Sequence, residues 1–343
     1  MVRPAVGYIL LFFMTYAFIR TKKEIKNLLT FITILLLITS VWGILQFFNG
    51  YLSFEMAYVM ANDAVHLVYI NGRWRSFGTM ISPAQYGIVV AYLMVLVFIL
   101  ASRKMSFFLK MIYLGAGFAA LFAMVYSGTR SAYVVVPLAL ITLVILGKNL
   151  KLYFIGAGFG VLFLVLIVTP SNNYQIQRIQ SAFNGEHDES YMVRKRNQEM
   201  IRPWILAHPL GGGLGSTGVW GQKFSPGTFL AKFPPDSGYV RVAVELGWIG
   251  LIIYLIMIGK IMISGIFAYW KMTDPELKKI VLAILSMLAA ISVVEYAQEV
   301  INKLPTNMLF WIFLGILFKS IQIEKAEQQT QLLTAEFGKV ESK

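Results

Sequence analysis

The chain contains no cysteine and few charged residues, and each deficit excludes whole classes of protein. Without cysteine there is no disulfide framework, no thiol nucleophile and no thiolate metal site. Charged residues make up 14% of the 343 residues and hydrophobic residues 57%, whereas an average soluble domain is about 25% charged. This composition predicts a polytopic membrane protein.

Signals for cleavage and for metal binding are also missing from the sequence. The first apolar run is followed by Arg20-Thr21-Lys22-Lys23 and not by a small-residue cleavage site, so no cleavable signal peptide is predicted. The three histidines, His66, His187 and His208, have no metal-ligand spacing with one another. We therefore expect no metal and no cofactor.

Apolar runs of about the length that crosses a bilayer, roughly 17–25 residues, recur along the chain. Such runs are helices, because lipid offers no partner for unpaired backbone groups. We expect about nine spans: 4–19, 28–48, 83–100, 107–126, 132–146, 152–168, 240–267, 280–294 and 304–318. The fold expected is an all-α polytopic membrane protein with one large loop, residues 170–239, between the sixth and seventh spans. Residues 1–318 form a single transmembrane domain, and residues 319–343 a polar tail.

The net charge of +13 could suggest nucleic-acid binding, but its placement indicates membrane topology instead. Most Lys and Arg residues lie in alternate short connections, at 20–26, 103–110, 148–151 and 271–279. By the positive-inside rule these connections are cytoplasmic, so the 170–239 loop lies outside and the tail inside. The N-terminus is then outside with no span before it, and one explanation is that upstream helices are missing through truncation or a late start codon.

Several arginines on the outer side run against this topology rule. Arg73 and Arg75 precede a span, and Arg130 lies in a connection so short that it must sit at the membrane boundary. A guanidinium group offers a fixed fork of donors that suits phosphate oxygens. The alternative is that these side chains only anchor helix ends at lipid headgroups. Glycine and Ser or Thr flank both Arg75 and Arg130, and this setting favours a binding role for the two together.

The best acid–base candidate is Asp236, directly before a span, where partial burial would suit a general base. The alternative is that Asp236 or Ser237 simply caps the following helix. Arg241 and Glu245 are four residues apart on one face of that helix, so a structural ion pair is an even alternative to a functional role. His208 precedes Pro209 at a turn, which favours a bystander over a base.

Five short motifs, in this order and topology, resemble the O-antigen ligase/polymerase family of membrane glycosyltransferases. The resemblance covers about residues 72–318. The motifs are Arg75-Ser76-Phe77-Gly78-Thr79-Met80-Ile81-Ser82-Pro83, Ser127-Gly128-Thr129-Arg130-Ser131-Ala132, Pro209-Leu210-Gly211-Gly212-Gly213-Leu214-Gly215, Asp236-Ser237-Gly238-Tyr239 and Glu245-Leu246-Gly247-Trp248-Ile249-Gly250. Members of this family have about three spans after the large loop, as expected here, and more spans before it than the six expected here, which also favours missing N-terminal helices.

The resemblance implies sugar transfer from an undecaprenyl-pyrophosphate-linked glycan on the outer face of a bacterial plasma membrane, without a metal or a nucleotide sugar. Arg75 and Arg130 would hold the pyrophosphate, where preset cations stabilise the charge that develops on the leaving group. Asp236 would act as the base. The residues expected to support substrate binding are Arg202, Tyr239, Arg241, Glu245 and His208. Expected partners are membrane lipid, the lipid-linked glycan and, in polysaccharide assembly, a chain-length regulator.

One departure from the family pattern bears on the type of transfer. Ligases of this family usually have a His near the start of the span after the large loop, and here that place is taken by Asp236. The sequence therefore favours a polymerase, which passes the chain to another lipid-linked unit. A ligase that passes it to lipid A core, a protein or another acceptor is the first alternative, and a lipid-linked glycan flippase the second. An assembly or anchoring protein, or an inactive truncated member of the family, is also left open.

Overall fold

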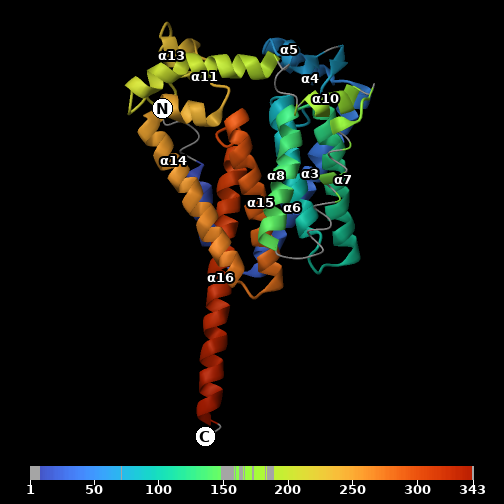
Figure 1. Cartoon of the computed structure of the whole chain (residues 1–343). Coiled ribbons are helices and arrows are strands. Elements are labelled where there is room, and N and C mark those ends of the chain that lie inside the picture. The colour runs from blue at the N-terminus through green and yellow to red at the C-terminus, as the bar shows by residue number, and fades with distance from the viewer. Residues whose placement is uncertain are drawn as a thin grey trace.

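The computed structural model describes residues 8–70, 72–147, 158, 160–161, 165, 167–171, 174–181, 183 and 189–341. In these ranges the protein is a bundle of long helices, with short helices lying across one end of it (Figure 1). Seven described helices are long and apolar enough to cross a membrane, as expected for a multi-pass membrane protein. They are α3 (Lys22–Asn49), α6 (Pro83–Leu100), α7 (Phe107–Ser127), α8 (Arg130–Gly147), α14 (Gly238–Lys271), α15 (Pro275–Ala297) and α16 (Thr306–Glu341).

The remaining described elements are short, apart from the 19-residue helix α11, whose composition is polar. They are α2 (Ile9–Phe18), α4 (Ser53–Ala61), α5 (Val65–Val68), β1 (Tyr69–Ile70), β2 (Arg73–Trp74), α10 (Tyr174–Ser181), α11 (Glu189–Ala207), α12 (Gly218–Phe224) and α13 (Phe229–Lys232). The two strands pair antiparallel, Tyr69 with Trp74 and Ile70 with Arg73. Within the described ranges, this small hairpin is the one departure from the expected all-α fold.

The expected spans and the observed helices agree for most of the bundle and differ at both ends of the chain. The described part of the first expected span is α2, whose ten residues are too few to cross a bilayer alone. The sixth expected span, 152–168, lies mostly outside the described residues. At the other end, α16 continues without a break past residue 318, where the sequence suggested that a separate tail begins.

Local sequence signals explain where several of the long helices begin and end. Helix α3 begins with a capping box, in which the Thr21 side chain accepts from the Glu24 backbone and the Glu24 carboxylate accepts from the Thr21 backbone. Asp274 caps α15 and is followed by Pro275 at the first helical position. Helix α7 ends where Gly128 takes a left-handed conformation at φ 56°.

Helix α6 forms the centre of the bundle and packs against α7, α8 and α15. Its buried residues include Tyr86, Tyr92, Leu96 and Leu100, each at most 1% exposed. Helix α14 lies at the edge, and many of its apolar side chains after Glu245, such as Ile253 and Phe267, are exposed. A peripheral helix that exposes apolar residues all along its length fits contact with lipid.

The two ends of the bundle differ in what they carry (Figure 1). We call one end the loop face; it holds the 50–82 connection, the 128–129 turn, α10 to α13 and the 298–305 connection. The opposite end is the tail face; it holds the 19–21, 101–106 and 272–274 connections, and the second half of α16 projects from it. Lys22 pairs with both Asp274 and Glu327, and Lys279 donates to the Ser102 carbonyl, so these segments share one end.

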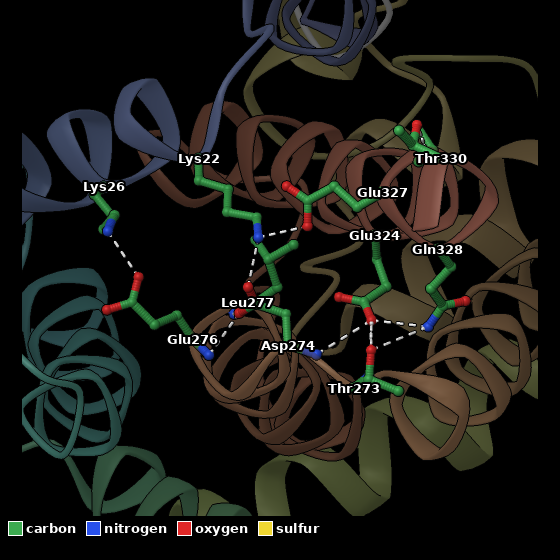
Figure 2. A network of polar contacts seen from close by, with 11 residues as sticks. Lys22, Lys26, Thr273, Asp274, Glu276, Leu277, Glu324, Glu327, Gln328 and Thr330 are labelled. Carbon is green, nitrogen blue, oxygen red and sulfur yellow. Dashed lines mark hydrogen bonds and ion pairs between the residues drawn. The ribbon is translucent and has the colours of Figure 1, made fainter. Parts of the chain in front are cut away.

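A polar network fixes the tail face, as Figure 2 shows. Glu324 Oε1 accepts from the backbone N–H groups of Thr273, at 2.7 Å, and Asp274, at 3.2 Å. The same oxygen accepts from Gln328 Nε2 at 2.9 Å. Helix α16 therefore satisfies backbone donors of the α14–α15 connection as it leaves the bundle.

Candidate functional site

A tight turn between α7 and α8 carries one of the predicted arginines, Arg130, and two other arginines bind it. Arg75 Nε donates to the Ser127 carbonyl at 2.8 Å, and Arg178 Nε, from α10, donates to the Gly128 carbonyl at 2.6 Å. Arg130 is the first residue of α8 and is half-buried. We call residues 127–130, together with Arg75 and Arg178, the arginine turn.

Arg75 points into the protein and binds backbone. Besides its bond to Ser127, it donates from Nη1 to the Leu67 carbonyl at 2.9 Å and from Nη2 to Thr129 Oγ1 at 3.1 Å. Because these donors point at the turn directly before Arg130, the geometry gives Arg75 a role in fixing where α8 begins. That Arg75 also holds the pyrophosphate stays a prediction.

Helix α3 holds the segment after Arg75 through one glutamine. Gln46 Oε1 accepts from the backbone N–H groups of Phe77, at 3.1 Å, and Gly78, at 2.8 Å. Gln46 Nε2 in turn donates to Glu55, which also accepts from Trp42 Nε1 at 2.9 Å. The motif that begins at Arg75 is thus locked to α3 by buried hydrogen bonds.

Asp236 lies just before α14, on the same face of the bundle. Its Oδ2 accepts from Asn197 Nδ2 of α11 at 2.7 Å, and its side chain is half-buried. Ser237 is the helix cap, because its side chain accepts from the Val240 N–H. The cap predicted for this position is therefore Ser237, and Asp236 is left for another role.

Arg241 and Glu245 form a buried ion pair that extends to the α15–α16 connection. Arg241 Nη1 lies 3.3 Å from Glu245 Oε1, and Arg241 Nε lies 2.8 Å from Glu299 Oε1. Glu245 also accepts from Thr217 Oγ1 at 3.0 Å, and Glu299 pairs with Lys303 at 3.3 Å. The structural pair that the sequence offered as an alternative is thus present, within a larger network.

Two of the glycine-rich motifs bind one another. At Gly247 the chain of α14 leaves helical geometry, with φ 74° and ψ 176°. The break frees the carbonyls of Val244 and Glu245, which accept from the backbone N–H groups of Gly212 and Gly213, both at 2.9 Å. A Cβ on Gly247 would lie 1.9 Å from the Pro209 carbonyl oxygen, so only glycine fits there. The large loop is therefore fixed to α14 by backbone contacts.

A cavity of about 340 Å³ lies between α11 and the loop-face end of α15. Its lining is rich in cations and includes one carboxylate: Arg194, Lys195, Gln198, Glu199, Arg202, Tyr296 and Ala297. Arg202, predicted as a supporting residue, is thus on the cavity wall. Asn197, which donates to Asp236, precedes Gln198 on the same helix. Helix α11 therefore both binds the acid–base candidate and lines the cationic cavity.

The other two predicted residues, Tyr239 and His208, contact backbone carbonyls. Tyr239 donates to the Ser292 carbonyl and so ties α14 to α15. His208 is exposed, stacks on Trp204 with ring centroids 4.1 Å apart, and has Nδ1 2.8 Å from the Trp204 carbonyl. These contacts are those of the bystander that its sequence context favoured.

Sequence reasoning missed Arg178, Asn197 and Glu299. None lies in a recognisable motif, and their partners are 50, 39 and 58 residues away in sequence, so no local pattern could have found them. In the part of the chain that the structure describes, no three His, Asp or Glu side chains form a group that could hold a metal ion.

The fold and this face define a multi-pass helical membrane protein with a cationic, loop-covered site at one end. A family profile described as O-Antigen ligase matches residues 115–255, which include residues 127–130 and Arg178 of the arginine turn, the large loop and the first half of α14. The match supports the resemblance of this chain to the O-antigen ligase/polymerase family. A comparison with curated proteins finds no match.

Proposed function

We propose that the protein polymerises lipid-linked oligosaccharide repeat units into a surface polysaccharide, using an undecaprenyl-pyrophosphate-linked donor. The observation that carries this proposal is the pairing of Asp236 with a cationic cavity through one helix, α11. Asn197 holds Asp236, and Arg202 lines the cavity from the same helix. The transfer of a sugar from a pyrophosphate requires a carboxylate that takes a proton and cations that offset the charge on the leaving group.

The loop face is proposed to lie outside the cell and the tail face in the cytoplasm. The basic connections at 20–26, 103–110 and 271–279 belong to the tail face, and this distribution supports a cytoplasmic location. Helix α8 ends at the tail face, whereas Thr169 accepts from Gln180 of α10 at the loop face. These two described segments therefore lie on opposite faces of the bundle.

The proposed reaction forms one glycosidic bond and breaks one sugar–phosphate bond. A hydroxyl of the acceptor unit attacks the anomeric carbon of the donor, and Asp236 takes the hydroxyl proton. The bond from the anomeric carbon to the phosphate oxygen breaks, and the lipid pyrophosphate leaves with the electron pair. Arg130 and the cavity arginines offset the charge on the leaving group, while Arg75 holds the turn that places Arg130.

The first alternative is a ligase with the same donor and a different acceptor. The family match supports both, and the aspartate at residue 236 in place of the ligase histidine favours the polymerase. The second alternative, a flippase, would move the lipid-linked glycan without transferring it. Its activity would not depend on a carboxylate that accepts a proton at residue 236.

The test is glycan display in a strain that lacks the gene, complemented with wild type, Asp236→Asn, Arg130→Ala or Arg202→Ala at equal membrane expression. General-base removal lowers rates by about 10²–10⁴-fold, so Asp236→Asn should leave single repeat units attached to the surface acceptor. Asp63→Asn and Arg73→Ala are matched controls, because both residues are exposed on the loop face outside the site, and they should restore full chains.

Two results would overturn this proposal in different ways. Full-length chains that accumulate on the lipid without attachment in the deletion strain would identify a ligase. If Asp236→Asn and Arg202→Ala each restored full chains, neither residue would take part in the reaction and the proposed site would be wrong.

A further inference from the structure

Glu295 is a fully buried carboxylate at the loop-face end of α15, and no motif in the sequence singles it out. Its side chain is 0% exposed. Within the described ranges no Lys or Arg side chain lies at ion-pair distance from it. A buried carboxylate carries a desolvation cost and is usually held by hydrogen bonds for a purpose.

One oxygen of Glu295 fixes the connection between α15 and α16. Oε2 accepts from the backbone N–H of Val300 and from that of Ile301, each at 2.7 Å. The connection carries Glu299, which pairs with Arg241 of α14. The carboxylate therefore sets where the partner of Arg241 lies.

The other side of Glu295 fixes the segment that carries Asp236. A Cβ on Gly238 would lie 1.7 Å from Glu295 Oε1, so the first turn of α14 rests directly on the carboxylate. Ser237 Oγ donates to the Glu295 backbone carbonyl at 3.3 Å. Asp236 directly precedes Ser237, so α15 fixes its backbone through Ser237 and Asn197 of α11 fixes its side chain.

We propose that Glu295 is a positioning residue for the transfer reaction. It joins the Asp236 segment to the α15–α16 connection, so that the positions of Asp236 and Arg241 relative to one another stay fixed. This inference rests on the proposed function. The carboxylate acts through its two acceptor bonds and through its contact with Gly238. It does not touch the reacting atoms.

The kinetic test uses the full chain in membranes, with lipid-linked repeat units extracted from the deletion strain as substrate. Glu295→Ala should lower kcat by roughly 10- to 100-fold, because a misplacement of about 1 Å costs rates of this order. KM for the lipid-linked unit should change by less than about threefold, because the cavity is intact. Glu295→Gln keeps an acceptor oxygen for both N–H groups and should keep more than about a third of kcat.

A double-mutant cycle with Gly238 makes the test specific. Gly238→Ala should lower kcat as Glu295→Ala does, because its Cβ displaces the carboxylate. In the Glu295→Ala background the space is free, so Gly238→Ala should cause no further loss. Losses that multiply, a Glu295→Gln variant as inactive as Glu295→Ala, or a Glu295→Ala variant with wild-type kcat would each overturn the inference.

A second readout does not depend on catalysis. The chain has no cysteine, so Ile301→Cys introduces a single thiol at a buried site. Maleimide labelling of this thiol should be at least about tenfold faster with Glu295→Ala than with Glu295, because the loss of its acceptor lets the connection open. Equal labelling would refute the role of Glu295 in holding the α15–α16 connection. Faster labelling with Glu295→Ala, together with a wild-type protein that polymerises nothing, would instead refute the proposed function alone.

Discussion

The two faces of the bundle hold their charges in different ways. At the tail face, Lys22 pairs with Asp274 and Glu327 through side chains that are 27%, 22% and 44% exposed. At the loop face, Arg241, Glu245 and Glu299 are only 8%, 1% and 5% exposed. The tail-face pairs remain close to water and join the ends of helices. The loop-face pairs carry a cost of desolvation, and such buried charges are expected at functional sites.

The largest effect that separates the two faces is expected from Arg241→Ala. Its removal leaves Glu245 buried without its cation and leaves Glu299 with only the partly exposed Lys303, which costs about 3–5 kcal/mol. Thermal unfolding in detergent should show this as a loss of stability well beyond that of any single tail-face variant. An Arg241→Ala protein as stable as a Lys22→Ala protein would abolish the distinction between the faces.

Gly247→Ala should give the next largest effect. A residue other than glycine at φ 74° costs about 1–3 kcal/mol, and the Cβ would also push against the Pro209 carbonyl. The large loop should detach from α14, seen as faster proteolysis between α11 and α12. Gly259→Ala in the same helix is the matched control, because nothing lies within 4 Å of its Cβ position. That control should be neutral or slightly stabilising.

Asp274→Ala should have a smaller and pH-dependent effect at the tail face. Its Oδ1 accepts from the Glu276 and Leu277 N–H groups as the cap of α15, and loss of such a cap costs about 0.5–2 kcal/mol. Burial acts to raise the pKa of Asp274, but the bonds from Lys22 and from the two N–H groups outweigh it, so the net pKa is lowered.

The direction of this shift fixes the pH dependence. A carboxyl with a lowered pKa in the folded protein contributes stability fully above its unfolded pKa and loses it as pH falls through the folded pKa. The difference in Tm between wild type and Asp274→Ala should therefore be constant near neutral pH and shrink on acidification below about pH 4. A difference that grows on acidification would contradict the assignment.

The smallest effect is expected from Lys22→Ala. Partly exposed ion pairs contribute about 0–1 kcal/mol, and salt screens them. The change in Tm should be small and should shrink further in high salt, whereas that of Arg241→Ala should persist. Unfolding measured at low and high salt for both variants checks this contrast directly.

Much of the fold follows from the sequence by simple physics. Long apolar runs can cross lipid only as helices, so α3, α6, α7, α8, α14 and α15 were predicted within a few residues of their observed bounds. The ends were less predictable: the polar composition after residue 318 predicts a polar tail, and only the structure shows that α16 runs on through it. There Glu324 accepts from the Thr273 backbone and Glu327 pairs with Lys22 of α3.

The candidate site was only partly predictable. Arg202, Arg241 and Glu245 stood out because charge near a span is costly, and the structure gives each a place on the loop face. Arg75 stood out for the same reason, but its donors bind the backbone carbonyls of Ser127, in the arginine turn, and of Leu67. Which acceptor a guanidinium group finds depends on chain segments far away in sequence, and spacing carries no information about it.

The sequence by itself determined that this is a helical membrane protein with its basic connections on one side, because lipid forbids unpaired backbone and charge distribution follows topology. It also contains the glycines at which the backbone of the large loop contacts the backbone of α14. Only the tertiary structure decided that Asn197 holds Asp236, that Glu299 completes the Arg241 pair, and that Glu295 supports both. These contacts join segments about 40 to 60 residues apart, and such pairing is settled by packing and not by local pattern.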